Sequence, residues 1–178
     1  MRVLIVDPSC WYRVTGRRRW AGRGTGRAAY HGRVSADRMS PPQVGEKAAR
    51  ARTISDRDIE LFTELTGDRN PLHYDEALAS ESRFGALIVQ GGVTSGLLNA
   101  VVAEDLPGPG TVFLQVNWSF KAPVRPGDTI TGRAEVLEVR TDKPITKLKT
   151  SVIRDDGTLV LDGDAVCYTM SMARDGDP

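Results

Sequence analysis

Apolar residues recur with helical spacing in the stretch that follows residue 54, at Ile59, Leu61, Phe62 and Leu65. Ser55 is a residue type favoured at helix N-caps, and Asp58 stands three residues later, where a capping box has its acid. Gly67 stands where a helix commonly ends in a left-handed residue. We therefore predict a helix that begins after Ser55 and ends at about Thr66.

A second apolar stretch begins at Gly91 and Gly92 and stops before Pro107. Its apolar residues cover most of a helical circumference, at Val93, Leu97, Leu98, Ala100, Val101 and Val102. A helix that is apolar on nearly all sides is a buried one. At about a dozen residues this helix is too short to cross a bilayer. We predict a central helix enclosed by the rest of the fold.

Alternation of apolar and polar residues, the period of a strand, dominates the remaining chain. The predicted strands are Ala48 to Thr53, Thr111 to Phe120, Ile130 to Arg140, Ile145 to Ile153 and Leu159 to Met170. The alternation slips at Val136 and Leu137, which predicts a bulge. The sequence Asp-Asp-Gly at residues 155–157 predicts a hairpin. One buried helix against an antiparallel sheet of about five strands is an α+β architecture.

The loop between the two helices carries Asp68 and His73, five positions apart. Pro71 has no N–H and keeps Asn70 extended, so the loop cannot continue as a helix. Asp75 then caps a further short helix. A stiff loop would keep the two side chains in place as a general acid/base pair that shares a water molecule. The residue types alone fit equally well an ordinary turn in which His73 is an exposed polar residue.

The run Leu-Thr-Gly-Asp-Arg-Asn-Pro-Leu-His at residues 65–73 combines a glycine, an acid, a proline and a histidine at fixed spacing. It closely resembles the signature of the MaoC-like (R)-specific enoyl-CoA hydratases and dehydratases. The likeness extends from about Gly45 to Met170 and includes Val89-Gln90-Gly91 at the start of the central helix. This family has the hot-dog fold, so the resemblance implies an antiparallel sheet wrapped around that helix.

The resemblance also implies a reaction. In the family, a water molecule adds reversibly to a 2-enoyl thioester and gives an (R)-3-hydroxyacyl thioester, carried on coenzyme A or acyl carrier protein. Asp68 and His73 match the catalytic pair, although the sequence does not assign which is the acid and which the base. Free N–H groups at Gly91 or Gly92 are suited to stabilise the thioester oxygen.

Supporting roles are expected for Asn70 and Asn99. A serine of the family that supports the catalytic aspartate aligns with Asn99, whose amide can still donate a hydrogen bond to a carboxylate. A histidine often stands in the family where this chain has Gln90. Two alternative functions share the fold: an acyl thioesterase, and an acyl-binding partner subunit without activity. Neither alternative requires the Asp68 and His73 pair.

Charge and composition indicate which classes of partner and cofactor to expect. The chain has 24 basic and 23 acidic residues, and residues 1–38 contain nine of the basic and two of the acidic ones. Residues 39–178 therefore have 15 basic and 21 acidic residues, a net charge of −6. An acidic body does not suggest a nucleic-acid surface. His73 is the only histidine after residue 38, so a multi-histidine metal site is not available, and we expect neither a metal nor a redox cofactor.

Location and assembly follow from the cysteines and the expected fold. Cys10 and Cys167 form no CxxC motif and fit a reducing cytoplasm, with Cys167 expected to be a buried small residue. No stretch is long and apolar enough to suggest a membrane span. A single hot-dog unit leaves a sheet edge exposed, so a homodimer is expected.

Composition and periodicity divide the chain into three parts. Residues 1–38 are rich in arginine and glycine, without helical or strand periodicity, and are predicted to be a disordered extension without functional role. Met39 is then the expected natural start, residues 39–172 the folded domain and residues 173–178 a frayed tail.

Overall fold

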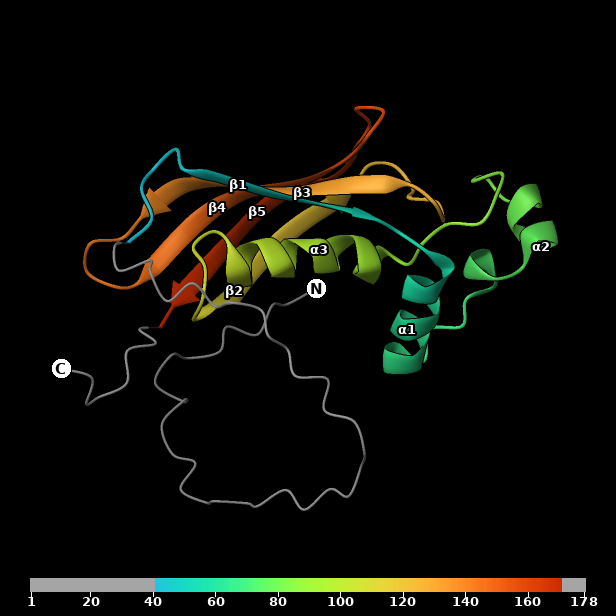
Figure 1. Ribbon diagram of the computed structural model, residues 1–178, viewed down its shortest axis with the longest axis horizontal. Coiled ribbons are helices and arrows are strands. Elements are labelled where there is room, and N and C mark those ends of the chain that lie inside the picture. Colours follow the sequence, from blue (N-terminus) through green and yellow to red (C-terminus); the bar gives the residue numbers. More distant parts are fainter. Residues whose placement is uncertain (1–40, 171–178) are drawn as a thin grey trace, which may run out of the picture. The chain divides into compact units, whose positions relative to one another are not determined.

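A computed structural model describes residues 41–170 (Figure 1). The expectations for residues 1–38 and 173–178 lie outside the described residues. In chain order the elements are β1 (Lys47–Thr53), α1 (Asp56–Thr66), the 3₁₀ helix η2 (Pro71–His73), α2 (Glu76–Glu81), α3 (Gly91–Glu104), β2 (Thr111–Phe120), β3 (Thr129–Val139), β4 (Ile145–Arg154) and β5 (Leu159–Thr169). No helix within this part of the chain is long and apolar enough to cross a membrane.

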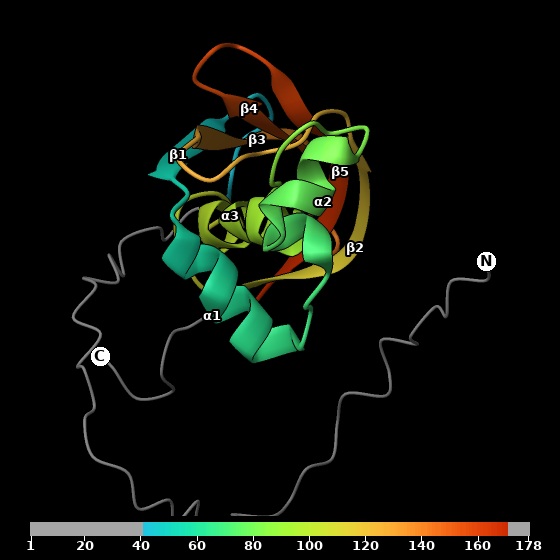
Figure 2. The same ribbon diagram turned by 90° about the vertical axis from the view of Figure 1, so that its right-hand side faces the viewer.

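The five strands form one antiparallel sheet in the order β1-β3-β4-β5-β2. The sheet curves around α3, which lies along its inner face, while α1 and α2 lie beyond one end of that helix (Figures 1 and 2). The predicted α+β arrangement of a sheet wrapped around a central helix is therefore confirmed.

Helix α3 supplies much of the core, as its apolar circumference predicts. Its buried residues are Thr94, Leu97, Leu98, Val101 and Val102. The four apolar residues among them pack against the inward-facing residues of β3, β4 and β5. Helix and sheet approach closely at Gly132 of β3, where a Cβ atom would lie 3.1 Å from Cγ of Leu97. A Cβ there would make a tight contact, so the side chains of Leu97 and Leu98 would have to shift.

The ends of α1 are set by local residues. Ser55 and Asp58 form the predicted capping box, and Gly67 ends the helix with a left-handed φ of 77°. Burial tends to raise the pKa of the Asp58 carboxyl, but hydrogen bonds from Ser55 and Arg52 bring this pKa below its usual value. The capping box is therefore formed by an ionised carboxylate at neutral pH.

The buried face of α1 is narrower than its apolar pattern suggests. Ile59 and Thr63, four residues apart, are its buried residues, whereas Leu61 and Leu65 are exposed. A polar residue thus takes a core position that the apolar pattern did not mark.

Three register shifts shape the sheet in the described part of the chain, and one of them, between Val152 and Ile153 of β4, lies opposite β5. The bulge predicted at Val136 and Leu137 is confirmed by a register shift between Val136 and Glu138. A second register shift, between Phe113 and Gln115 of β2, was not predicted, because an unbroken alternation of apolar residues conceals the change of face. Several apolar side chains of this edge strand are exposed, namely those of Val112, Leu114, Val116 and Phe120.

The burial of α3 leads to a stability prediction. Leu98→Ala removes a side chain that is 0% exposed and should lower the free energy of unfolding by about 2–5 kcal/mol. Leu137→Ala changes a leucine that is 44% exposed and should alter it by less than about 0.5 kcal/mol. Urea denaturation followed by circular dichroism measures both. Equal losses in the two variants would contradict the core position of Leu98.

Candidate active site

The loop after α1 holds Asp68 through short-range hydrogen bonds. The N–H of Gly67 donates to the carbonyl of Thr63 at 2.8 Å and closes the helix. The N–H of Asn70 donates to Oδ1 of Asp68 at 3.1 Å. The Asn70 side chain in turn accepts from the N–H of Leu72 at 3.1 Å and caps η2. Successive turns of this kind leave the loop little freedom, and the Asp68 side chain remains 39% exposed.

His73 lies at the end of η2 and is 8% exposed. Its Nδ1 lies 2.7 Å from the carbonyl oxygen of Ile88. A carbonyl can only accept, so Nδ1 carries the proton and donates it to Ile88. When the ring is neutral, Nε2 therefore presents a lone pair. It lies 3.6 Å from Oδ2 of Asp68, so the structure brings the two predicted catalytic side chains together.

The start of α3 is the third part of the site. Gly91 and Gly92 occupy its first two positions, where N–H groups have no acceptor inside the helix. Aromatic rings pack directly on both glycines: a Cβ at Gly92 would lie 2.1 Å from Cζ of Phe62, and one at Gly91 would lie 3.1 Å from Cζ of Phe120. A Cβ at Gly92 would force the Phe62 ring to move, and one at Gly91 would make a tight contact with Phe120. The dipole of α3 favours negative charge at this end.

Comparison with known proteins assigns the family. The family described as "MaoC like domain" matches residues 39–157, more than half of the chain. The chain belongs to the MaoC-like family.

Two relatives and one solved structure illustrate the similarity. An (R)-specific enoyl-CoA hydratase of Aeromonas caviae is 37% identical over 124 residues, covering 70% of this chain and 92% of that protein. A 3-hydroxybutyryl-CoA dehydratase of Methylorubrum extorquens is 39% identical over 125 residues, covering 70% and 78%. The structure of an (R)-hydratase from A. caviae involved in PHA biosynthesis matches with a TM-score of 0.69 at 36% identity, covering 72% and 98%. The predicted hot-dog fold is confirmed.

The two asparagines predicted to support the pair lie in different places. Asn70 stands two residues after Asp68 in the loop, and its N–H donates a hydrogen bond to the carboxylate. Asn99 lies on α3 with an exposed side chain, and within residues 41–170 no hydrogen bond joins it to Asp68. The support expected from Asn99 therefore stays a prediction.

Three residues that surround the loop of Asp68 and His73 were not predicted as part of the site, namely Thr63, Tyr74 and Gln90. Thr63 donates a hydrogen bond to the main-chain oxygen of Asp68 at 2.7 Å, and its hydroxyl also contacts that of Tyr74. The Gln90 side chain donates to Thr63 Oγ1 at 3.0 Å. One signal in the sequence was available: Thr63 stands four residues after Ile59, on the apolar face of α1.

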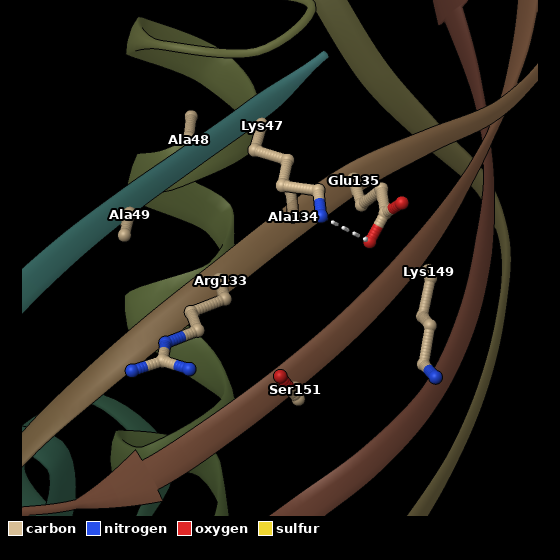
Figure 3. Close-up of a pocket in the computed structure, with 8 residues that line it drawn as sticks. All are labelled: Lys47, Ala48, Ala49, Arg133, Ala134, Glu135, Lys149 and Ser151. Atoms are coloured by element: carbon tan, nitrogen blue, oxygen red, sulfur yellow. Dashed lines mark ion pairs between the residues drawn. The ribbon is translucent and has the colours of Figure 1, made fainter. Parts of the chain in front are cut away.

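Other candidate features lie away from the pair. A hollow of about 470 Å³ on the outer face of the sheet is lined by residues of β1, β3 and β4, among them Lys47, Arg133, Glu135 and Lys149 (Figure 3). Three of these charges alternate in sign from strand to strand, with Lys47 opposite Glu135 and Glu135 opposite Lys149, as is common on a solvated sheet face. The hollow includes neither Asp68 nor His73.

The thiol of Cys167 is not a candidate nucleophile. Cys167 is buried in β5, as predicted. Burial raises the pKa of its thiol to about 12. The thiolate, which is the nucleophilic form, is therefore scarce at neutral pH.

The left-handed end of α1 can be tested with a pair of glycine substitutions. Gly67→Ala places a Cβ at a φ of 77° and should destabilise the protein by about 1–2 kcal/mol. Gly96→Ala lies inside α3, where a Cβ meets no atom within 4 Å, and should stabilise it by about 0.5–1 kcal/mol. Thermal or urea denaturation should therefore show a lower free energy of unfolding for Gly67→Ala and a higher one for Gly96→Ala. A stabilising effect of Gly67→Ala would refute the left-handed cap.

Proposed function

We propose that this MaoC-like protein is a hydro-lyase that reversibly hydrates a 2-enoyl thioester to an (R)-3-hydroxyacyl thioester, with Asp68 and His73 as the catalytic pair. The observation that carries the proposal is the 3.6 Å separation of Asp68 Oδ2 and His73 Nε2. It is longer than a direct hydrogen bond and suits two groups that bind one water molecule. The names of the relatives, an enoyl-CoA hydratase and a 3-hydroxybutyryl-CoA dehydratase, support the substrate class.

In the proposed mechanism the pair holds the water while its oxygen attacks the β-carbon of the enoyl group. One member of the pair takes a proton from the water, and the pair delivers a proton to the α-carbon. The hydroxyl and the added hydrogen thus both derive from water, and no electrons are exchanged with a cofactor. Negative charge that develops on the thioester oxygen is stabilised by the N–H groups of Gly91 and Gly92.

The orientation of His73 supports this role. Its Nδ1 donates to the Ile88 carbonyl, which leaves Nε2 to accept from water when the ring is neutral. The Asp68 carboxylate has one oxygen bonded to the Asn70 N–H and the other facing His73. Each member thus presents one free acceptor to the space between them.

The reaction can be tested by adding crotonyl-CoA to the protein and measuring the decrease in enoyl absorbance over time. Asp68→Asn and His73→Ala should each lower kcat by about 10²–10⁴-fold, the usual contribution of acid/base catalysis. Asp155→Asn makes the same carboxylate-to-amide change at an exposed turn residue and should leave kcat unchanged. Thiol release without hydration would instead indicate a thioesterase, and no turnover by the wild-type protein would indicate an acyl-binding subunit. Either result would refute the proposal.

We further propose that two copies pair through the edge of β2. This strand ends the sheet, and its exposed apolar side chains include Val112 at 56%, Val116 at 44% and Phe120 at 56%. An unpaired edge with apolar side chains invites pairing with another strand. Pairing β2 with β2 of a second copy would cover these side chains and extend the sheet.

The dimer has its own test. Val116→Arg should weaken association and raise the monomer fraction in sedimentation velocity, because it places a charge in the covered edge. Leu137→Arg places the same charge on β3 at an equal exposure of 44% and should leave association unchanged. A wild-type protein that sediments as a monomer at micromolar concentration would contradict the pairing.

The proposed chemistry requires neither a metal ion nor a redox cofactor, since water and the two side chains supply all atoms that move. The absence of a cofactor and a cytoplasmic location stay predictions. The thioester carrier is either coenzyme A or acyl carrier protein, since both present the same acyl thioester to the pair.

A further inference from the structure

Gln90 is a buried polar side chain that the proposed chemistry does not use. It is 1% exposed and stands directly before α3. Its Nε2 donates to the carbonyl of Ile59 at 3.3 Å and to Thr63 Oγ1 at 3.0 Å. Its Oε1 has no hydrogen-bond partner among residues 41–170. A buried acceptor without a partner lowers stability, so burial of an amide here calls for a reason other than stability.

Thr63 connects Gln90 to the catalytic loop. The Thr63 hydroxyl has one proton, which it donates to the main-chain oxygen of Asp68. Its oxygen then accepts from Nε2 of Gln90 and from the hydroxyl of Tyr74. Every hydrogen-bonding position of the Thr63 hydroxyl is occupied. The Asp68 main chain is therefore tied, through Thr63, to the residue that precedes α3.

The same short segment also holds the other parts of the site. The carbonyl of Ile88 orients His73, and the N–H of Ile88 donates to the carbonyl of Leu72 at 3.1 Å. Two residues later Gln90 holds Thr63, and Gly91 and Gly92 follow at once. Residues 88–92 thus contact His73 directly and Asp68 through Thr63, and they present the free N–H groups of α3.

We propose that Gln90 is a positioning residue: through Thr63 it sets the place of Asp68 relative to His73. The proposal rests on the proposed function, since the pair is the one assigned there. Gln90 touches no reacting atom in this scheme. Without its amide donors, the Asp68 main chain loses the link to α3, and its separation from His73 is no longer held. Misplacement of a catalytic group by about 1 Å costs on the order of 10²-fold in rate.

The first test uses Gln90→Leu and Thr63→Val, which keep side-chain size and remove the linking hydrogen bonds. Each should lower kcat for crotonyl-CoA by about 10- to 100-fold, with KM within about threefold of the wild-type value. The double variant should be no slower than the slower single variant, because both changes break one chain of contacts. Thr63→Ser keeps the hydroxyl and should recover kcat to within about threefold of wild type.

A matched control separates positioning from general destabilisation. Thr150→Val removes another buried threonine hydroxyl, which accepts a hydrogen bond from Trp118 Nε1 at 2.9 Å in the core. It should lower the melting temperature and leave kcat unchanged. An equal kcat in Thr150→Val, Thr63→Val and Gln90→Leu would overturn the proposal, as would multiplicative losses in the double variant.

A second readout does not depend on activity. The Asn70 N–H donates to the Asp68 carboxylate, so its hydrogen exchange reports the position of that side chain. Exchange at Asn70 should be faster in Gln90→Leu and Thr63→Val than in the wild type and in Thr150→Val. Unchanged exchange would refute the positioning role. If the wild type fails to hydrate crotonyl-CoA, the proposed function fails, and the exchange measurement still decides whether Gln90 holds Asp68.

Discussion

The site depends on the burial of α3 in the curved sheet. Leu98, Val101 and Val102 pack against inward-facing residues of the strands, and Gly132 allows the close approach of helix and sheet. Because this packing is dense, the segment that leads into α3 is held in a fixed position relative to the sheet. That segment orients the His73 ring through Ile88 and reaches the Asp68 loop through Gln90 and Thr63. A general acid/base pair requires such a rigid frame, because its efficiency depends on geometry as well as on protonation.

The polar contacts around the pair divide into two kinds. Local turns hold the loop together, through Asn70 and the left-handed Gly67. Contacts between distant residues then set where the loop lies, since Thr63 is 27 residues from Gln90 and His73 is 15 residues from Ile88. The first kind makes the loop stiff, and the second kind brings its two ends to the start of α3.

Much of the fold follows from patterns in the sequence. The capping box at Ser55, the end of α1 at Gly67, the buried helix after Gly92 and the bulge after Val136 are signals carried by neighbouring residues. The Asp68 and His73 pair was indicated by the loop and by its family signature, and the structure places the two side chains near each other. Thr63 was not singled out because a threonine does not add to an apolar pattern, although its spacing of four residues from Ile59 places it on the buried face of α1. The register shift in β2 was equally hidden, because a bulge changes the face of the strand without interrupting the alternation of apolar residues in the sequence.

The sequence by itself determined the helix ends, the strand order along the chain and the residue types available for chemistry, because caps, turns and periodicity act between residues close in the chain. Only the tertiary structure decided which polar groups meet. The contact of Gln90 with Thr63, the orientation of His73 by Ile88 and the exposed position of Asn99 depend on how α1 and α3 pack. Such packing is settled by contacts between segments far apart in the chain, which a local pattern does not record.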